Sequence, residues 1–160
     1  MIERGTSRPE EGGADRARPS GEAPARRRGG TPAPKAPVRV LLVEDSEDDA
    51  DLTLCGLRRG GLALEYERVD TVDGLREALA RGAWDVVLSD YGMPRFNALE
   101  AFALVRAAAS DVPFVIVSGT MGEDTAVEAM RVGVHDYIVK GQLARLVPAV
   151  RRELDEARWR

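Results

Sequence analysis

The sequence is short of several residue types, and each shortage excludes a class of protein. It contains one cysteine, Cys55, so an internal disulfide is excluded. It has no apolar run near the ~20 residues that a membrane-spanning helix needs. The arginines and prolines at its start are not followed by an apolar stretch, so no signal peptide is visible. We therefore expect a cytoplasmic protein that does not contact membranes.

Histidine is equally scarce, since His135 is the only one. We interpret it as a structural residue at the start of a strand. A phosphotransfer histidine is expected in a helical bundle, and nothing around His135 suggests one.

Charge is spread unevenly along the chain. Residues 1–37 hold eight of the 23 Lys/Arg and five of the 27 Asp/Glu, so they carry about +3 and the remainder about −7. An acidic domain of this kind is a poor candidate for direct binding to nucleic acid.

Residues 1–37 are dominated by Gly, Pro, Arg, Ala and Glu and contain few residues to bury. This composition predicts a disordered tail, followed by one folded domain at 38–160. A start codon assigned too far upstream is an alternative origin for the tail.

From Val38 onward, apolar strand patterns alternate with helical ones. The expected strands are 38–43, 62–69, 84–90, 111–119 and 134–141. The expected helices lie in 46–59, 71–81, 99–105, 122–133 and 142–160. Five strands alternating with five helices predict an α/β protein with a doubly wound parallel sheet covered on both faces.

The first helix has a recognisable start and a predicted buried face. Ser46 followed by Asp49 resembles a capping box. Leu52, Cys55 and Leu57 are expected to face the core, which would make Cys55 a buried, unreactive thiol.

The segment WDVVLSDYGMP, residues 84–94, carries the strongest functional signal. A short apolar strand leads directly to Asp90, and Gly92 and Pro94 are expected to force a turn. The carboxylate is thereby left at the carboxyl edge of the sheet, where open α/β proteins bind their ligands.

Other strands end in chemically active residues as well. Glu44 and Asp45 follow the first strand, Ser118 ends the fourth and Lys140 ends the fifth. Three carboxylates in one pocket repel one another, and a hard cation such as Mg²⁺ removes that penalty and also accepts phosphate oxygens. Lys140 is the only lysine after residue 37, against fourteen arginines, and it can pair with one phosphate oxygen as a point charge.

On these five positions, in this order, the chain resembles the receiver domain of two-component response regulators, from Val38 to about Glu156. The resemblance implies a flavodoxin-like (CheY-like) fold with strand order 2-1-3-4-5. It implies that Asp90 is the phosphoacceptor and that Ser118 and Lys140 contact the phosphoryl oxygens.

The resemblance also implies a metal site and a switch. Asp45, Asp90 and the Gly92 carbonyl would hold Mg²⁺, with Glu44 acting largely through water. Ser118 and Tyr137 would be the switch residues, with Tyr137 turning inward on activation.

The implied partners are a sensor histidine kinase or phosphotransfer protein, which donates the phosphoryl group, and a downstream protein. The expected output surface is the fourth helix, fifth strand and last helix, with Arg131, Arg145, Arg151 and Arg152. The resemblance implies a bacterial phosphorelay protein that is not a turnover enzyme, and homodimer formation stays open. Because no output segment follows Arg160, we expect a stand-alone receiver.

Two departures and three alternatives accompany this interpretation. Glu44 stands at the first acidic position instead of Asp, a common variant in the family that lengthens the reach to the metal. Gly141 stands where the family often has a proline. A haloacid dehalogenase-type phosphatase would need an Asp at Gly92, and a dinucleotide-binding domain would need a glycine-rich turn where EDSEDD stands. A receiver fold that binds partners without phosphorylation stays open as the main alternative.

Removal of residues 1–37 should leave the thermal midpoint of unfolding nearly unchanged. Ordering a residue costs about 1–2 kcal/mol of backbone entropy, and the tail has few apolar side chains to offset that cost. Calorimetry on both forms tests this, and a large drop on truncation would show that the tail packs on the domain.

Overall fold

A computed structural model describes residues 36–108, 111–119 and 122–159. The chain divides into two units at Pro34–Lys35, and all described residues belong to the second unit, Lys35–Arg160. The predicted disordered tail therefore lies almost entirely outside the described residues.

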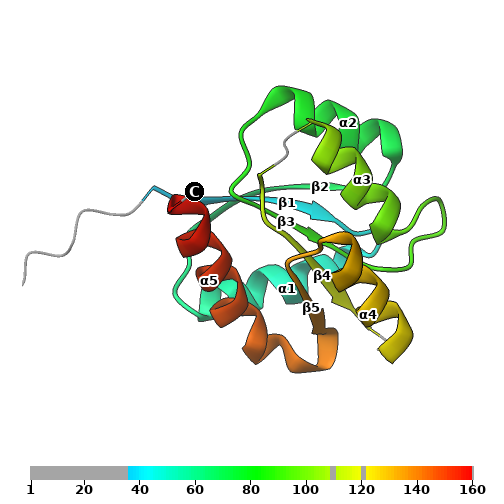
Figure 1. The fold of residues 1–160 in the computed structure, drawn as a ribbon. Helices are drawn as coiled ribbons and strands as arrows, with labels where there is room; N and C mark the ends of the chain where they lie inside the picture. The colour runs from blue at the N-terminus through cyan, green and yellow to red at the C-terminus, as the bar shows by residue number, and fades with distance from the viewer. Residues whose placement is uncertain (1–35, 109–110, 120–121, 160) are drawn as a thin grey trace, which may run out of the picture. The chain divides into compact units, whose positions relative to one another are not determined.

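The second unit alternates strands and helices along its whole length (Figure 1). Its strands are β1 (Val38–Val43), β2 (Leu64–Val69), β3 (Val86–Ser89), β4 (Phe114–Ser118) and β5 (Asp136–Val139). Its helices are α1 (Glu47–Arg59), α2 (Val72–Arg81), α3 (Ala98–Ala108), α4 (Glu123–Val132), the 3₁₀ helix η1 (Lys140–Arg145) and α5 (Leu146–Arg158).

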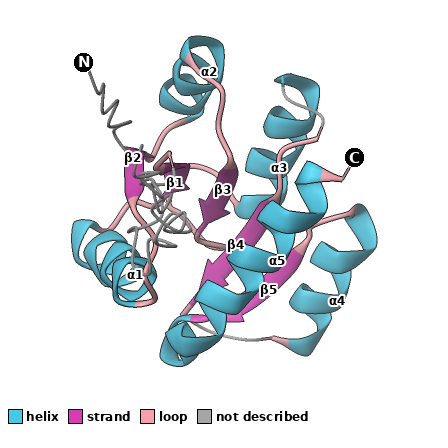
Figure 2. Cartoon of the chain, turned by 90° about the vertical axis from the view of Figure 1, so that its left-hand side faces the viewer, coloured by secondary structure: helices cyan, strands magenta, loops and turns pink. Residues whose placement is uncertain are grey.

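The strands form one parallel sheet in the order β2-β1-β3-β4-β5, as the resemblance implied. Figure 2 shows the strands in this order across the molecule. The central strands β1, β3 and β4 are almost wholly buried, which fits their continuous apolar sequences.

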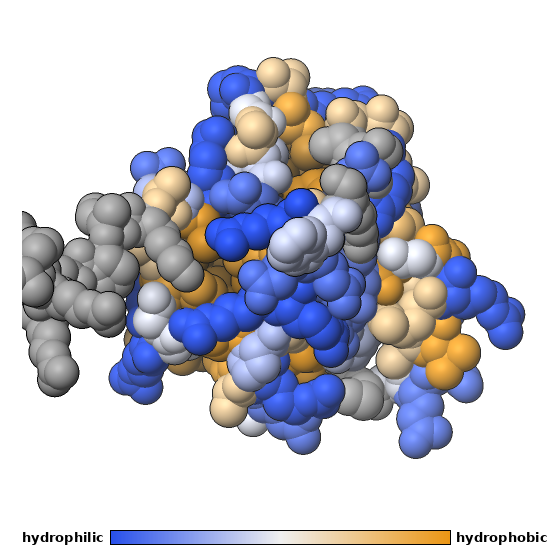
Figure 3. Space-filling model, turned by 60° about the vertical axis from the view of Figure 1, so that its left-hand side comes forward, coloured by the Kyte–Doolittle hydropathy of each residue, from blue (hydrophilic) through white to orange (hydrophobic). Residues whose placement is uncertain are grey.

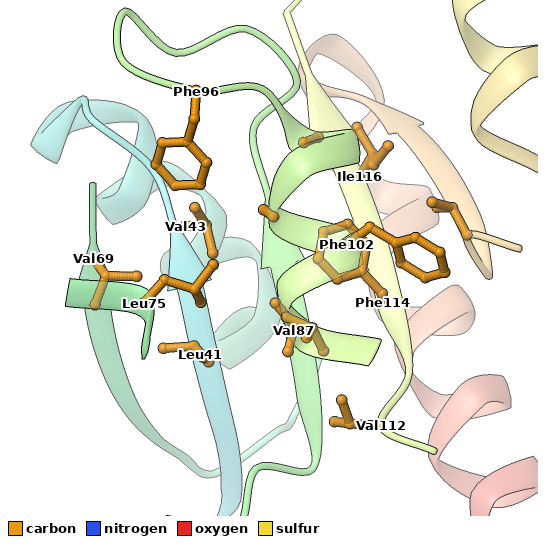
Figure 4. Close-up of a cluster of buried hydrophobic side chains, with 14 of the residues drawn as sticks. Leu41, Val43, Val69, Leu75, Val87, Phe96, Phe102, Val112, Phe114 and Ile116 are labelled. Atoms are coloured by element: carbon orange, nitrogen blue, oxygen red, sulfur yellow. The ribbon is translucent and has the colours of Figure 1, made fainter. Parts of the chain in front are cut away.

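Two hydrophobic cores lie on opposite faces of this sheet, because strand side chains alternate between the faces. Leu41, Val87 and Phe114 belong to the core beneath α2, α3 and α4. Figure 4 shows this cluster, in which the rings of Phe102 and Phe114 meet edge to face at 5.2 Å. The other core joins the alternate strand residues, such as Leu88, to α1 and α5.

Side-chain caps begin α1 at Ser46, where the sequence predicts one, and α2 at Thr71. The Ser46 hydroxyl accepts the Asp49 N–H at 3.2 Å, and the Thr71 hydroxyl accepts the Gly74 N–H at 3.0 Å. Each cap satisfies an amide that the helix itself leaves without a partner.

The predicted buried face of α1 is partly wrong. Cys55 is exposed and Leu52 is 60% exposed, whereas Ala50, Thr53, Leu54 and Leu57 are buried. The buried residues follow the i, i+3, i+4, i+7 spacing of one helical face, and Leu52 and Cys55 lie on the opposite side of the helix. Cys55 is thus a surface thiol.

The last helix also begins differently from the prediction. Val139 ends β5, Lys140 starts η1, and the regular helix α5 begins only at Leu146. Pro148 lies in the first turn of α5, where its missing N–H is not needed. Within the described ranges every peptide bond is trans, including the one before Gly141.

Hydrophilic side chains cover most of the molecular face in Figure 3, with smaller hydrophobic areas between them. None of the helices within residues 36–108, 111–119 and 122–159 combines the length and apolar character needed to cross a bilayer.

Replacing Gly60 by Ala should destabilise the domain by about 1–3 kcal/mol, the usual cost of overpacking. A Cβ at Gly60 would overlap Val147 Cγ2 of α5. The φ angle of Gly60 is −76°, which alanine adopts without strain, so the destabilisation would come from this overlap and not from the backbone conformation. Urea unfolding measures the loss. Gly56→Ala is the matched control, because its Cβ would meet Leu143 at an ordinary 3.7 Å and helix propensity favours Ala. Equal effects of the two changes would contradict the steric argument.

Candidate functional site

The register of the sheet brings the chemically active residues to one edge. Val43 pairs with Ser89, Ser89 with Ile116, and Ile116 with Tyr137. Glu44 and Asp90 each follow a member of this row, so both leave the sheet at its carboxyl edge. The predicted common edge is therefore present.

Asp90 is held firmly from both sides of its backbone. Its N–H donates to the Val43 carbonyl at 2.8 Å, and the Ser89 hydroxyl donates to its carbonyl at 2.9 Å. One carboxylate oxygen, Oδ1, accepts the Tyr91 N–H at 2.9 Å. The side chain is 13% exposed, so the carboxylate is fixed in place and still reachable from solvent.

A closed loop follows Asp90 instead of the single turn expected from Gly92 and Pro94. Gly92 pairs with Asn97 in an isolated antiparallel bridge, and the Ala98 N–H donates to the Tyr91 carbonyl at 2.9 Å. The Asn97 side chain accepts the Glu100 N–H and so caps α3. The loop that contains Gly92 is thereby tied at both ends.

Three acids converge beside this loop. Glu44, Asp45 and Asp90 each offer a carboxylate oxygen, and the three oxygens lie within 4.8 Å of one another. Glu44 is buried and Asp45 is exposed. Mg²⁺ binds oxygen at about 2.1 Å, so two oxygens on one ion lie at most about 4.2 Å apart. The donor set fits Mg²⁺ with a small contraction, or with one acid acting through water.

The ammonium group of Lys140 lies among these acids. Its Nζ is 3.0 Å from Glu44 Oε2 and 3.4 Å from Asp90 Oδ1. Its shortest ion pair, at 2.7 Å, joins it to Asp49 Oδ2 of α1. The positive charge offsets part of the mutual repulsion of the acids.

Burial and pairing act against each other on the charges of this pocket. Burial raises the pKa of Glu44 and the pKa of Asp90 above their ordinary values, although hydrogen bonds with Lys140 act in the opposite direction. Burial alone would lower the pKa of Lys140, but its hydrogen bonds to Asp49 and Glu44 outweigh burial and raise it. Lys140 is therefore a permanent cation, whereas burial makes the ionised forms of Glu44 and Asp90 less favourable.

Ser118 and Tyr137 lie on neighbouring strands at the same edge. Ser118 is buried and pairs with Val139, the residue before Lys140. Tyr137 pairs with Ile116 and is only 6% exposed, within the core beneath α2, α3 and α4. By strand alternation Ser118 faces the same side as Ile116 and Tyr137. The two candidate switch residues thus share one face of the sheet.

Asp49 is the residue of this pocket that the sequence interpretation missed. It was assigned only to the helix cap, a role that its backbone N–H does perform. Strand alternation contains the missing signal. Lys140 shares the parity of Ile138, whose side chain belongs to the core beneath α1 and α5, so the first turn of α1 is its natural neighbour.

His135 has the structural position expected of it. Its Nδ1 accepts the Phe114 N–H at 3.0 Å, and its own N–H donates to the Phe114 carbonyl. It therefore continues the ladder between β4 and β5 and does not belong to the acidic pocket.

The arginines expected on the output surface are partly committed to contacts within the domain. Arg151 donates to the Gly60 carbonyl at 2.6 Å, and Arg152 pairs with Asp136 at 2.8 Å. The exposed side of α4 instead presents the apolar residues Val127 and Met130, which the sequence interpretation did not single out.

Together, the sheet and the pocket define an α/β signalling module of the receiver type. The family model "Response regulator receiver domain" matches residues 40–151. The chain is also similar to response regulator protein FleR of Pseudomonas aeruginosa, at 36% identity over 108 residues, covering 68% of this chain and 22% of that protein.

Solved structures agree with the sequence matches. A CheY-like response regulator receiver domain protein from Methanospirillum hungatei aligns with a TM-score of 0.67 and 21% identity, covering 77% of this chain and 98% of that one. NtrX from Brucella abortus aligns with a TM-score of 0.69 and 26% identity, covering 78% of this chain and 28% of that one.

The chain belongs to the response regulator receiver family. Members of this family are signalling modules and not turnover enzymes, and they interact with histidine kinases or phosphotransfer proteins. The chain spans between 22% and 53% of the length of the first curated relatives it matches.

Asp90→Asn should raise the thermal midpoint of the metal-free domain by several degrees at neutral pH. The pKa of Asp90 is raised on folding, so its ionisation opposes folding at pH values above the folded pKa. As the pH falls through the raised folded pKa, the advantage of Asn should shrink, and it should vanish below the ordinary value of 3.8, where the carboxyl group is protonated in both states.

Thermal unfolding at several pH values checks this prediction. Asp155→Asn is the control, because it removes one exposed charge from α5 outside the pocket. A gain for Asp90→Asn that is independent of pH, or matched by the control, would count against the electrostatic cause.

Proposed function

We propose that this domain is a phosphoacceptor that takes a phosphoryl group from a phosphohistidine of a histidine kinase or phosphotransfer protein onto Asp90, with Mg²⁺ as cofactor. The observation that carries the proposal is the pocket itself. A fixed, reachable carboxylate stands within 3.4 Å of a permanent cation and beside two further acids that fit a divalent metal.

Asp90 is the nucleophile of the proposed reaction. A carboxylate oxygen attacks phosphorus and forms an O–P bond, while the N–P bond of the phosphohistidine breaks. The electron pair of that bond returns to the imidazole nitrogen of the partner. Since the transfer needs positioning more than covalent chemistry, the fixed backbone of Asp90 is a direct advantage.

Charge in this pocket decides whether a phosphoryl group can enter. Three carboxylates alone would repel it. Mg²⁺ would supply positive charge to the phosphoryl oxygens. The metal would be held by Asp45, Asp90 and the Gly92 carbonyl, with Glu44 acting largely through water. Lys140 contributes a second positive charge from the same edge, and it can move from a carboxylate to a phosphoryl oxygen without leaving the pocket.

The signal would leave through Ser118 and Tyr137. A phosphoryl group on Asp90 offers the Ser118 hydroxyl a new acceptor, and Ser118 shares its face of the sheet with Tyr137. Val127 and Met130 on α4 form an exposed apolar area near this face, which suits contact with a downstream protein. We place the output surface on α4, β5 and α5.

The proposal is tested by incubating the protein with Mg²⁺ and acetyl phosphate and measuring its intact mass. We expect the gain of one phosphoryl group, its loss on treatment with hydroxylamine, and no gain in Asp90→Asn. Asp45→Ala should need a much higher Mg²⁺ concentration, because it removes one ligand of the metal.

Asp155→Asn serves as the matched control for lost charge and should behave as the unmodified protein. The same hydroxylamine-sensitive adduct in Asp90→Asn would reject Asp90 as the acceptor. If no adduct forms at any Mg²⁺ concentration, the domain is better interpreted as a receiver fold that binds partners without phosphorylation.

A further inference from the structure

The lysine of the pocket has three carboxylate neighbours, and the one that lies closest does not belong to the metal-binding cluster. Lys140 Nζ lies 2.7 Å from Asp49, 3.0 Å from Glu44 and 3.4 Å from Asp90. An ammonium group has three N–H donors, so it can serve all three acids at once. Glu44 and Asp90 are candidate metal ligands, whereas Asp49 stands on α1 outside that group.

This division matters as soon as a divalent cation enters. Glu44 and Asp90 would hold a divalent cation, and the positive charge of that cation would repel the ammonium group. Of the three partners of Lys140, only Asp49 would then keep its full negative charge for the lysine. Without it, Lys140 would compete with the metal for Glu44 and Asp90, or leave the pocket.

Asp49 is also well placed to act as a fixed anchor. Its own N–H is held by the Ser46 hydroxyl, and the Ser46 N–H is in turn held by Glu44 Oε1 at 3.1 Å. The start of α1 is therefore tied to the acidic pocket through backbone atoms, and the carboxylate of Asp49 remains available to Lys140.

We infer that Asp49 is a positioning residue, which holds the Lys140 ammonium at the rim of the pocket so that the metal can occupy the acids and the lysine can meet the phosphoryl group. The inference rests on the proposed phosphoacceptor function. It adds to that function a residue that acts only through Lys140.

Asp48 provides a matched control for Asp49. Both acids lie in the first turn of α1, but Asp48 is exposed and Asp49 is half-buried against Lys140. Asp48→Asn and Asp49→Asn remove the same charge from the same helix end, and neither change touches the backbone cap. Their difference isolates the ion pair with Lys140.

The first measurement is Mg²⁺ affinity by isothermal titration calorimetry, which needs no phosphoryl donor. Asp49→Asn should weaken Mg²⁺ binding roughly threefold or more beyond Asp48→Asn, because Lys140 then turns to the metal ligands. In a Lys140→Met background the two substitutions should have equal effects. Asp49→Glu, which keeps the carboxylate, should recover much of the loss.

The second measurement is the rate of phosphoryl uptake from acetyl phosphate at saturating Mg²⁺. It should stay lower in Asp49→Asn than in Asp48→Asn, because Lys140 is less well placed even when the metal site is full. The thermal midpoint of each variant confirms that it is folded.

The outcomes separate this inference from the proposed function. If the unmodified protein takes up the phosphoryl group while Asp49→Asn and Asp48→Asn behave alike, Asp49 has no positioning role and the proposed function stands. An Asp49 effect that persists unchanged in Lys140→Met also overturns the inference. If the unmodified protein neither binds Mg²⁺ nor takes up the phosphoryl group, both fail.

Discussion

The placement of one ammonium group among carboxylates is the constraint on which the functional edge of this domain depends. Glu44 and Asp90 are mostly buried, and burial disfavours their charged forms. Lys140 makes their ionisation tolerable, since its ion pairs outweigh its own desolvation. The pairing of β4 with β5 places this lysine beside the pocket, and the pairing of β1 with β3 places Glu44 and Asp90 there. The register of the sheet therefore brings the positive and negative charges together.

The candidate site residues are divided between the two faces of the sheet. Strand alternation assigns Lys140 to the side of α1 and α5, and Ser118 and Tyr137 to the side of α2, α3 and α4. Charge pairing at the acids therefore happens beside α1, whereas Ser118 lies on the side of the sheet that α4 covers. A parallel sheet separates these two roles naturally, because neighbouring residues at a strand end point in opposite directions.

The alternation of strands and helices follows from local sequence patterns, whereas the strand order and the roles of the site residues were implied by the resemblance. The strand order agreed with what the resemblance implied, although it places β1 beside β3, which is not its neighbour along the chain. The cap at Ser46 was found in place, because it depends only on residues a few positions apart. The buried face of α1 was misjudged at Leu52 and Cys55, because the prediction followed the apolar character of single residues instead of the helical spacing of Ala50, Thr53, Leu54 and Leu57. Asp49 was missed because its partner lies 91 residues further along the chain.

The segment after β5 is fastened to α1 at two points. Lys140 is held by Asp49, and one turn later Leu143 lies against Gly56, where a Cβ would come within 3.7 Å of it. The contact of Leu143 with α1 does not involve the lysine side chain, so it can hold the backbone of η1 in place while the ammonium group changes partner. The Lys140–Asp49 ion pair belongs to the side chain, so it is the attachment that a change of partner would break. Movement of the charge therefore requires rotation of the lysine side chain and no shift of the backbone beneath it.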